Sequence, residues 1–150
     1  MKIFEKTHEW LDKANLLPVD VNIIREWINE ELDEFEDALK NRDKEGMYDA
    51  VIDINVFLAN LSYFYKLDVK RLGEYADAVN KSNWTKFCTT EQEVNDTISS
   101  YLNGTHPNKL GEKVDTYCST SDGIYVIKRV SDNKILKSIN FKDTSEFLDF

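Results

Sequence analysis

Along the N-terminal part of the chain, apolar residues recur with the spacing of amphipathic helices. Residues 21–40 carry one apolar stripe, whereas residues 45–66 carry apolar side chains on two opposite faces. Because only a short stretch separates these two segments, we expect two antiparallel helices that lie side by side. A helix that is apolar on two faces also needs a second partner. The stripe of the first helix comprises Val21, Ile24, Ile28, Phe35 and Leu39.

Three further helices are expected. The first covers residues 2–15 and ends before Pro18, which disfavours helical backbone at the residue that precedes it. A second helix covers residues 69–87. The third begins at Thr90, where a Thr-x-x-Glu capping box opens an apolar run, and it ends at Asn103-Gly104.

The C-terminal part has a different pattern. Residues 123–130 and 134–140 are rich in β-forming residues and flank the turn Ser131-Asp132-Asn133, which predicts a β-hairpin. The fold class is therefore mainly α: an antiparallel bundle of four to five helices with a C-terminal β-hairpin. With 150 residues the chain is long enough for one hydrophobic core, so we expect a single domain. Its helical core would span residues 1–104, and a loop and hairpin extension would span residues 105–150.

Two glutamates lie beside the apolar stripe of residues 21–40. Glu31 and Glu34 fall on one flank of the stripe at a spacing of three residues, so they can share a ligand. Charge on a half-buried helix face loses hydration, which is costly unless something compensates it. The other acids of this run are interpreted as solvated charge, as charge runs usually are: Glu30, Asp33, Glu36 and Asp37.

The second central helix carries a polar column inside one of its apolar faces. Asp49, Asp53 and Asn60 lie four and seven residues apart, which places them on one side of the helix. Unpaired buried ions cost several kcal/mol each, so the column requires a partner. A salt bridge to a basic residue elsewhere is one solution, although residues 45–66 contain no Lys or Arg before Lys66. A bound cation is the other.

Carboxylates on two facing helices favour the cation. Oxygen-only ligands suit a hard divalent metal, Mg²⁺ or Mn²⁺, and Mg²⁺ usually brings substrate phosphates with it. The candidate metal ligands, which are also the candidate catalytic residues, are Glu31, Glu34, Asp49 and Asp53.

The charge of the chain limits its partners. The net charge is −9, and it is uneven: residues 1–78 hold 18 acids and 10 bases, whereas residues 79–150 hold 10 acids and 9 bases. No basic stripe is present to neutralise a row of phosphates, so we expect no extended nucleic-acid binding. A small anionic ligand is compatible with this charge if a metal and a few cations from the near-neutral second half offset its charge.

Other function classes are also disfavoured. No stretch approaches 18 uninterrupted apolar residues and no signal peptide is visible, so we expect a protein without membrane contact that is located in the cytoplasm. Cys88 and Cys118 are too few for a disulfide framework. His8 and His106 are isolated, so we take both as ordinary surface or loop residues and expect no zinc site.

Asn83 falls inside the apolar stripe expected for residues 69–87. A polar amide on a core stripe needs hydrogen-bond partners. Lys86, three residues later, lies roughly 60° away around the same helix, so the two side chains can reach one ligand. The alternative for Asn83 is a purely structural role, in which its amide caps or bridges helices inside the protein.

Four segments together resemble a known superfamily. EELDEFEDAL and YDAVIDINVFL are similar to the acidic helices of the all-α nucleoside triphosphate pyrophosphohydrolases, which include MazG, dimeric dUTPase and phosphoribosyl-ATP pyrophosphohydrolase. With VNKSNWTKF and SDNKILKS, the order and spacing resemble most closely the phosphoribosyl-ATP-pyrophosphohydrolase-like branch often carried by bacteriophages. In that case the cytoplasm would be that of the host.

The resemblance implies roles for individual residues. Glu31, Glu34 and Asp53 would bind Mg²⁺, with Asp49 as a fourth ligand or an orienting base. The usual second motif is Glu-x-x-Asp, but Ala50 stands three residues before Asp53, so Asp49 in a DxxxD spacing replaces the usual acid.

The remaining two segments would bind the substrate. Asn83 would contact the base or sugar of a nucleotide, and Lys86 its phosphates. Lys134 and Lys137 match the lysines of a terminal hairpin, for which exposed strand lysines are the alternative reading. Asn60 completes the expected substrate-binding set.

The implied activity is Mg-dependent hydrolysis of a nucleoside triphosphate, with a deoxynucleotide expected, to the monophosphate and pyrophosphate. The enzyme would be a homodimer or homotetramer with its site near a subunit interface, in agreement with the two apolar faces of residues 45–66. Phosphoribosyl-ATP hydrolysis is a second enzymatic reading. A catalytically silent nucleotide-binding or scaffold protein is the reading from another class.

Overall fold

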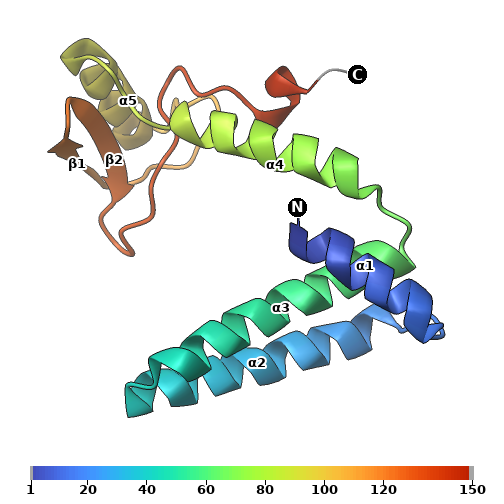
Figure 1. Ribbon diagram of the computed structural model, residues 1–150. Helices are drawn as coiled ribbons and strands as arrows, with labels where there is room; N and C mark the ends of the chain where they lie inside the picture. The colour runs from blue at the N-terminus through green and yellow to red at the C-terminus, as the bar shows by residue number, and fades with distance from the viewer. Residues whose placement is uncertain (1, 149–150) are drawn as a thin grey trace. The chain divides into compact units, whose positions relative to one another are not determined.

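The computed structural model describes residues 2–148, in which helices predominate (Figure 1). The mainly α fold class with a C-terminal hairpin is confirmed. No helix in this part of the chain is long and apolar enough to cross a membrane. In chain order the elements are α1 (Lys2–Ala14), α2 (Val21–Asn41), α3 (Lys44–Phe64), α4 (Val69–Trp84), α5 (Glu91–Asn103), β1 (Thr116–Ser121), β2 (Ile124–Arg129) and the short 3₁₀ helix η1 (Thr144–Phe147).

Residue contacts divide the chain into two units, residues 1–73 and residues 74–150. The boundary between them falls inside α4. The single domain expected from chain length stays a prediction, and the two units are described in turn.

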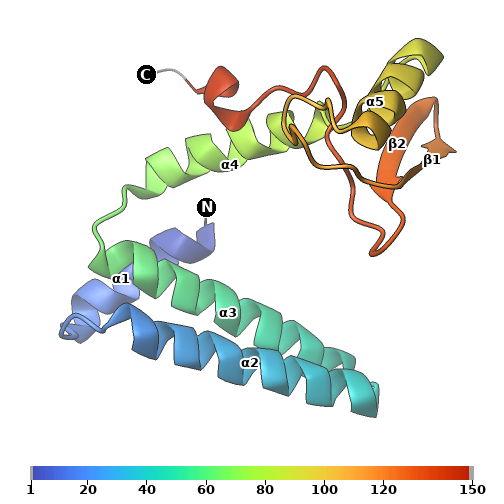
Figure 2. The ribbon, with the colours of Figure 1, turned by 180° about the vertical axis from the view of Figure 1, so that it is seen from behind.

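In the first unit, α2 and α3 lie antiparallel along each other, and α1 packs against α3 (Figures 1 and 2). Polar caps explain where these helices begin. The Asp20 carboxylate accepts a hydrogen bond from the Asn22 N–H at 2.7 Å, and the Asp43 carboxylate accepts one from Gly46 at 3.1 Å. Arg42 adopts the left-handed conformation that ends α2, so α3 starts almost immediately and must run back along it.

The core of the first unit is small. It contains Phe4 and Leu11 of α1, Ile24 of α2, and Ala50 and Ala59 of α3. Both apolar faces of α3 were expected to be buried, and this prediction is wrong for the single chain. Three large aliphatic side chains of α3 are substantially exposed, because α1 and α2 cover only part of the helix: Val51 (44%), Ile52 (51%) and Leu58 (40%).

In the second unit, α5 packs against a two-stranded antiparallel sheet. Thr90 caps α5 as expected, accepting from the Glu93 N–H at 3.2 Å, and Gly104 ends it in the left-handed conformation. The Glu93 carboxylate bonds the Thr89 N–H at 2.9 Å, so the capping box is displaced by one residue. The core of this unit comprises Cys88, Tyr101, Val114, Ile127 and Leu136.

The hairpin does not pair the strands that were expected. β2 covers the predicted first strand, but its partner is β1, which precedes it, in the register Thr116 with Arg129 to Ser121 with Ile124. The predicted turn at residues 131–133 exists, but only Ile135 of the segment after it forms a bridge, to Lys128. The strand predicted over residues 134–140 is therefore wrong: after the turn, one bridge is the only β pairing this segment makes.

His106 is not a surface residue, and that part of the prediction is wrong. It lies in the loop after α5 but is fully buried, with its ring stacked on Tyr101 at a centroid distance of 4.0 Å. Its Nδ1 accepts a hydrogen bond from the Asn108 N–H at 3.2 Å. Burial lowers the pKa of His106, so the neutral imidazole is favoured. His8 is half-buried in α1, with Nε2 2.7 Å from Ser62 Oγ.

Candidate functional site

Glu31 on α2 senses the charges of Asp49 and Asp53 on α3, so these acidic residues of the two helices lie near one another. Glu31 and Asp53 are half-buried, whereas Glu34 and Asp49 are exposed. The orientation of α2 predicted from the sequence is correct at Glu30 and Glu31, because Glu30 is exposed and Glu31 is half-buried. Burial of a carboxylate removes hydration from its charged form, and Glu31 is half-buried.

Electrostatics connects all four carboxyl groups. The pKa of Glu31 is raised above its ordinary value of 4.5, first by burial and then by the negative charges of Glu34, Asp53, Asp49 and Glu30. A carboxyl group that senses four acids from its own and the facing helix lies in a shared acidic field. No basic side chain within residues 2–148 forms an ion pair with Asp49 or Asp53, so the salt-bridge alternative finds no support.

The donor atoms fit a hard cation in chemical type. All four groups are carboxylates, and mutual repulsion is what a bound cation relieves. The side chains do not, however, converge into a finished cage: in the described chain, no group of three or more His, Cys, Asp or Glu side chains is close enough to hold a metal ion. The two helices therefore bring the carboxylates near one another, but the side chains would have to rotate before they could coordinate one cation together.

Asn60 continues the polar column into the interior. It is 7% exposed, and its Oδ1 is buried without a hydrogen-bond partner among residues 2–148. Along the column burial thus increases from exposed Asp49, through half-buried Asp53, to buried Asn60. An unsatisfied buried acceptor costs about 1–3 kcal/mol, which makes Asn60 a position that structure alone does not explain.

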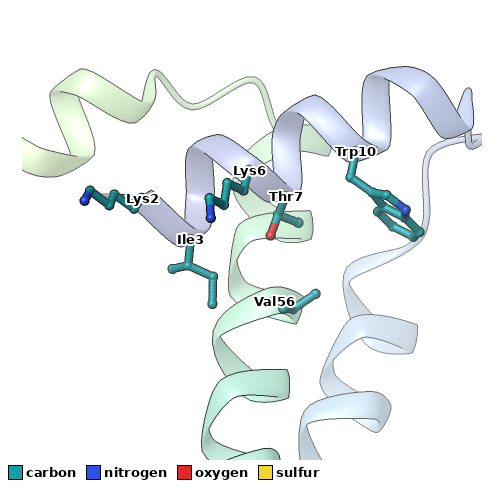
Figure 3. Close-up of a pocket in the computed structure, with 6 residues that line it drawn as sticks. All are labelled: Lys2, Ile3, Lys6, Thr7, Trp10 and Val56. Carbon is teal, nitrogen blue, oxygen red and sulfur yellow. The ribbon is translucent and has the colours of Figure 1, made fainter.

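A groove along α1 adds cations to the first unit. It is lined by Lys2, Lys6 and Trp10 at successive turns of α1, and Val56 of α3 forms the opposite wall (Figure 3). Val56 follows Asp53 by three residues, so the groove borders the acidic helix. Phosphate-binding cations were expected only from the second half of the chain, so these lysines were not predicted. Their spacing of four residues on one helix was the available signal.

The second unit holds the other candidate residues. Asn83 is exposed rather than part of the core, because Ala78 and Ser82 form the buried side of α4. It lines a shallow cavity with Asn80, Trp84 and Phe87. The prediction that Asn83 lies in a core stripe is therefore wrong, and an internal structural role is disfavoured by its exposure.

Hydrogen bonds join the segment that carries Asn83 and Lys86 to the one that carries the other two lysines. Ser82 Oγ donates to the Lys142 carbonyl at 2.8 Å, and Ser138 Oγ donates to the Thr85 carbonyl at 3.1 Å. Lys134 is exposed, in agreement with the alternative that it is an exposed lysine without a role in binding. It does not, however, lie on a strand. The Lys137 ammonium lies 3.9 Å from the centre of the Phe141 ring, a cation–π contact.

A comparison with protein families identifies the first unit and most of α4. The family model for phosphoribosyl-ATP pyrophosphohydrolase matches residues 5–83, more than half of the 150-residue chain. The chain belongs to the phosphoribosyl-ATP pyrophosphohydrolase family. No curated protein and no solved structure matches it significantly. The resemblance to the pyrophosphohydrolase superfamily is thereby confirmed.

Membership of the phosphoribosyl-ATP pyrophosphohydrolase family implies a hydrolase that releases pyrophosphate. The matched span contains Glu31, Glu34, Asp49 and Asp53, together with Asn60 and Asn83. Lys86, Lys134 and Lys137 lie outside it. The family therefore covers the acidic helices, whereas the roles of the C-terminal lysines depend only on their resemblance to a shorter motif.

Proposed function

We propose that this protein is a Mg-dependent nucleoside triphosphate pyrophosphohydrolase, which cleaves between the α- and β-phosphates to release a nucleoside monophosphate and pyrophosphate. The observation that carries this proposal is the shared acidic field around Glu31, which lies inside the span that matches the family. A deoxynucleotide is the expected substrate.

The four acidic residues would hold the cation. Glu31, Glu34 and Asp53 would bind Mg²⁺ or Mn²⁺, and Asp49 would act as a fourth ligand or orient the attacking water. When bound, the cation would neutralise charge on the phosphates and lower the pKa of a water molecule. Burial and repulsion from neighbouring acids destabilise the charged form of Glu31 in the folded chain. Coordination of a cation would relieve this destabilisation.

Cationic side chains would stabilise the charge that develops on the phosphates as the bond breaks. Lys2 and Lys6 lie along the groove beside the acidic helix, and Lys86, Lys134 and Lys137 come from the second unit. A nucleotide is the small anionic ligand that the charge of the chain permits. We further propose a homodimer or homotetramer in the cytoplasm, since α3 exposes large apolar side chains in the single chain.

Phosphoribosyl-ATP is a second candidate substrate, and the matching family model is the specific observation that favours it. Its hydrolysis breaks the same phosphoanhydride bond and needs the same acidic residues. The two activities therefore differ in how the base and the additional ribose phosphate are recognised, not in the metal site.

A substrate panel tests the proposal. Pyrophosphate release is measured for the common nucleoside and deoxynucleoside triphosphates and for phosphoribosyl-ATP, with Mg²⁺, with Mn²⁺ and with a chelator. We expect turnover of at least one triphosphate that stops when the metal is chelated. Glu31→Gln, Glu34→Gln and Asp53→Asn should each lower kcat by roughly a hundredfold or more, because each removes a ligand.

Glu30→Gln and Glu36→Gln are the matched controls, since both residues are exposed on the same helix. They should retain nearly full activity. Metal-independent turnover, or an equal loss in Glu30→Gln, would contradict the metal site. Release from phosphoribosyl-ATP alone would select the second candidate, and no release from any substrate would leave the protein as a nucleotide binder without catalysis.

A further inference from the structure

In the second unit, β1 has a neighbouring strand on only one side (Figures 1 and 2). β2 is paired on both sides: β1 lies along one edge, and Cys88 and Ile135 form bridges to the other. β1 also lies outside the span that matches the family, which ends at residue 83. Its free edge is therefore a feature that the proposed hydrolysis does not use.

The hairpin register shows which backbone groups of β1 face the free edge. In an antiparallel pair, the N–H and C=O of one residue point to the same side of the strand, and this side alternates from residue to residue. On β2, Tyr125 exchanges two hydrogen bonds with Cys88, and the Ile127 carbonyl accepts one from the C-terminal segment, so both residues point away from β1. Their partners on β1, Thr120 and Cys118, must then point away from β2.

The same alternation extends to Thr116, two residues before Cys118. Thr116, Cys118 and Thr120 thus present three N–H and three C=O groups along the edge, and none of these groups bonds the backbone of another segment within residues 2–148. Unpaired strand groups of this kind are a template for a further strand. Native proteins usually protect such an edge with a charged residue, a proline or a bulge, but β1 has the sequence TYCSTS and a continuous register.

A second copy of β1 fits this edge. If two β1 strands run antiparallel about a twofold axis at Cys118, this residue lies opposite its own copy, and Thr116 lies opposite Thr120 of the second copy. Each of these three facing pairs exchanges two hydrogen bonds. The outward-pointing groups of both strands are then all paired, because these residues are placed symmetrically about Cys118.

Charge also favours an identical partner at this strand. A chain with a net charge of −9 repels its own copy, so copies meet most easily where charged side chains are absent. β1 carries no charged residue. In the register centred on Cys118, Asp115 lies opposite Ser121 of the second copy. Asp122 lies opposite Val114 of the second copy, so no acid faces another acid.

We propose that β1 pairs with β1 of a second copy, which joins the two hairpins into one four-stranded antiparallel sheet. This contact is separate from the one expected at α3, because the two elements belong to different units. With both contacts, the homotetramer is the expected state rather than the homodimer. The inference concerns assembly and does not depend on the proposed reaction.

Removing a backbone donor from the free edge tests this contact. Thr120→Pro deletes an outward N–H, and proline is tolerated on an edge strand where its nitrogen faces solvent. Because two of the six hydrogen bonds between the copies are lost, the dissociation constant of the contact should rise about tenfold or more. Thr120→Val, the matched control, keeps the N–H and should assemble like the parent. Sedimentation equilibrium across a dilution series measures all three proteins.

Cross-linking tests the register and does not rely on the folding of Thr120→Pro. Tyr117 lies opposite Ser119 of the second copy with Cα atoms about 4.5 Å apart, a separation that a disulfide can span. In a Cys118→Ser background, where the remaining Cys88 is buried, Tyr117→Cys and Ser119→Cys chains are mixed and mildly oxidised. The mixture should form disulfide-linked dimers. Each variant alone should not, because equal positions lie about 7–8 Å apart across the axis.

The contact between β1 strands would be overturned by an unchanged dissociation constant in a folded Thr120→Pro, or by an equal loss in Thr120→Val. Cross-linking that is no greater in the mixture than in the separate variants would also overturn it. Assembly through α3 alone, or an edge that serves a strand of another protein, would give these results. Neither measurement involves pyrophosphate release, so failure of the proposed hydrolysis would leave this contact standing.

Discussion

Burial and four acidic neighbours destabilise the charged form of Glu31. Its spacing on α2 was enough to single it out, since helix phase depends only on local geometry. The same reasoning failed for Asn83. There the buried side of α4 is set by Ser82, whose hydroxyl bonds a carbonyl 60 residues away, and a local period contains no information about such a distant partner.

The raised pKa of Glu31 predicts a specific effect of pH on stability. A carboxyl whose folded-state pKa is raised binds its proton more tightly in the folded than in the unfolded chain. Stability is therefore lost as pH rises from about 4.5 through the folded-state pKa, and Glu31→Gln lacks this loss. In chelator-containing buffer, melting temperatures measured from pH 4 to pH 8 should fall more for the parent than for Glu31→Gln.

Adding Mg²⁺ should reduce that difference, because the cation takes over the role of the proton. Glu36→Gln, at an exposed position of the same helix, should follow the parent. Parallel melting curves for the parent and Glu31→Gln would show that Glu31 does not experience the acidic field.

At the scale of elements, helices were predicted more accurately than strands. Every helix was expected within a few residues of its observed bounds, because period and caps are local signals. The hairpin was assigned one strand too late. Its turn is Asp122-Gly123, with positive φ at both residues (53° and 76°), as a type I′ turn requires. The Asp-Gly pair between two β-rich runs was a signal for this turn in the sequence. The prediction paired residues 123–130 with the following segment instead, and so missed it.

This turn supports a prediction about glycine. Gly123 has no atom within 4 Å of an added Cβ, so only its positive φ opposes a larger residue. Gly123→Ala should lower the free energy of unfolding by about 1 kcal/mol. Gly73 in α4 is similarly open but lies in a helix, so Gly73→Ala should raise it by about 0.5–1 kcal/mol. Urea unfolding of both variants measures the two effects, and equal signs would contradict the assigned turn.

For the whole molecule, the family match extends over the first unit and most of α4, and stops where the C-terminal elements begin. The hydrogen bonds from Ser82 and Ser138 fasten the C-terminal tail to the end of α4. The proposed chemistry therefore belongs to an acidic helical unit, and residues 84–150 supply a separate core with lysines of their own. Sequence could indicate the acidic residues, but it could not reveal how little of α3 the other helices would cover.

That uncovered surface leads to the last prediction. In the single chain, Val51, Ile52 and Leu58 of α3 are each at least 40% exposed, and exposed apolar patches of this kind mark contact sites between proteins. We expect the protein to be a homodimer or homotetramer, and Ile52→Lys to shift it toward monomer, because a charge buried in the contact would be unpaired. Leu110→Lys is the control, since Leu110 is 78% exposed in a loop of the second unit. Size-exclusion chromatography with light scattering measures both variants. A monomeric parent, or an equal response to the two substitutions, would show that α3 is not the contact.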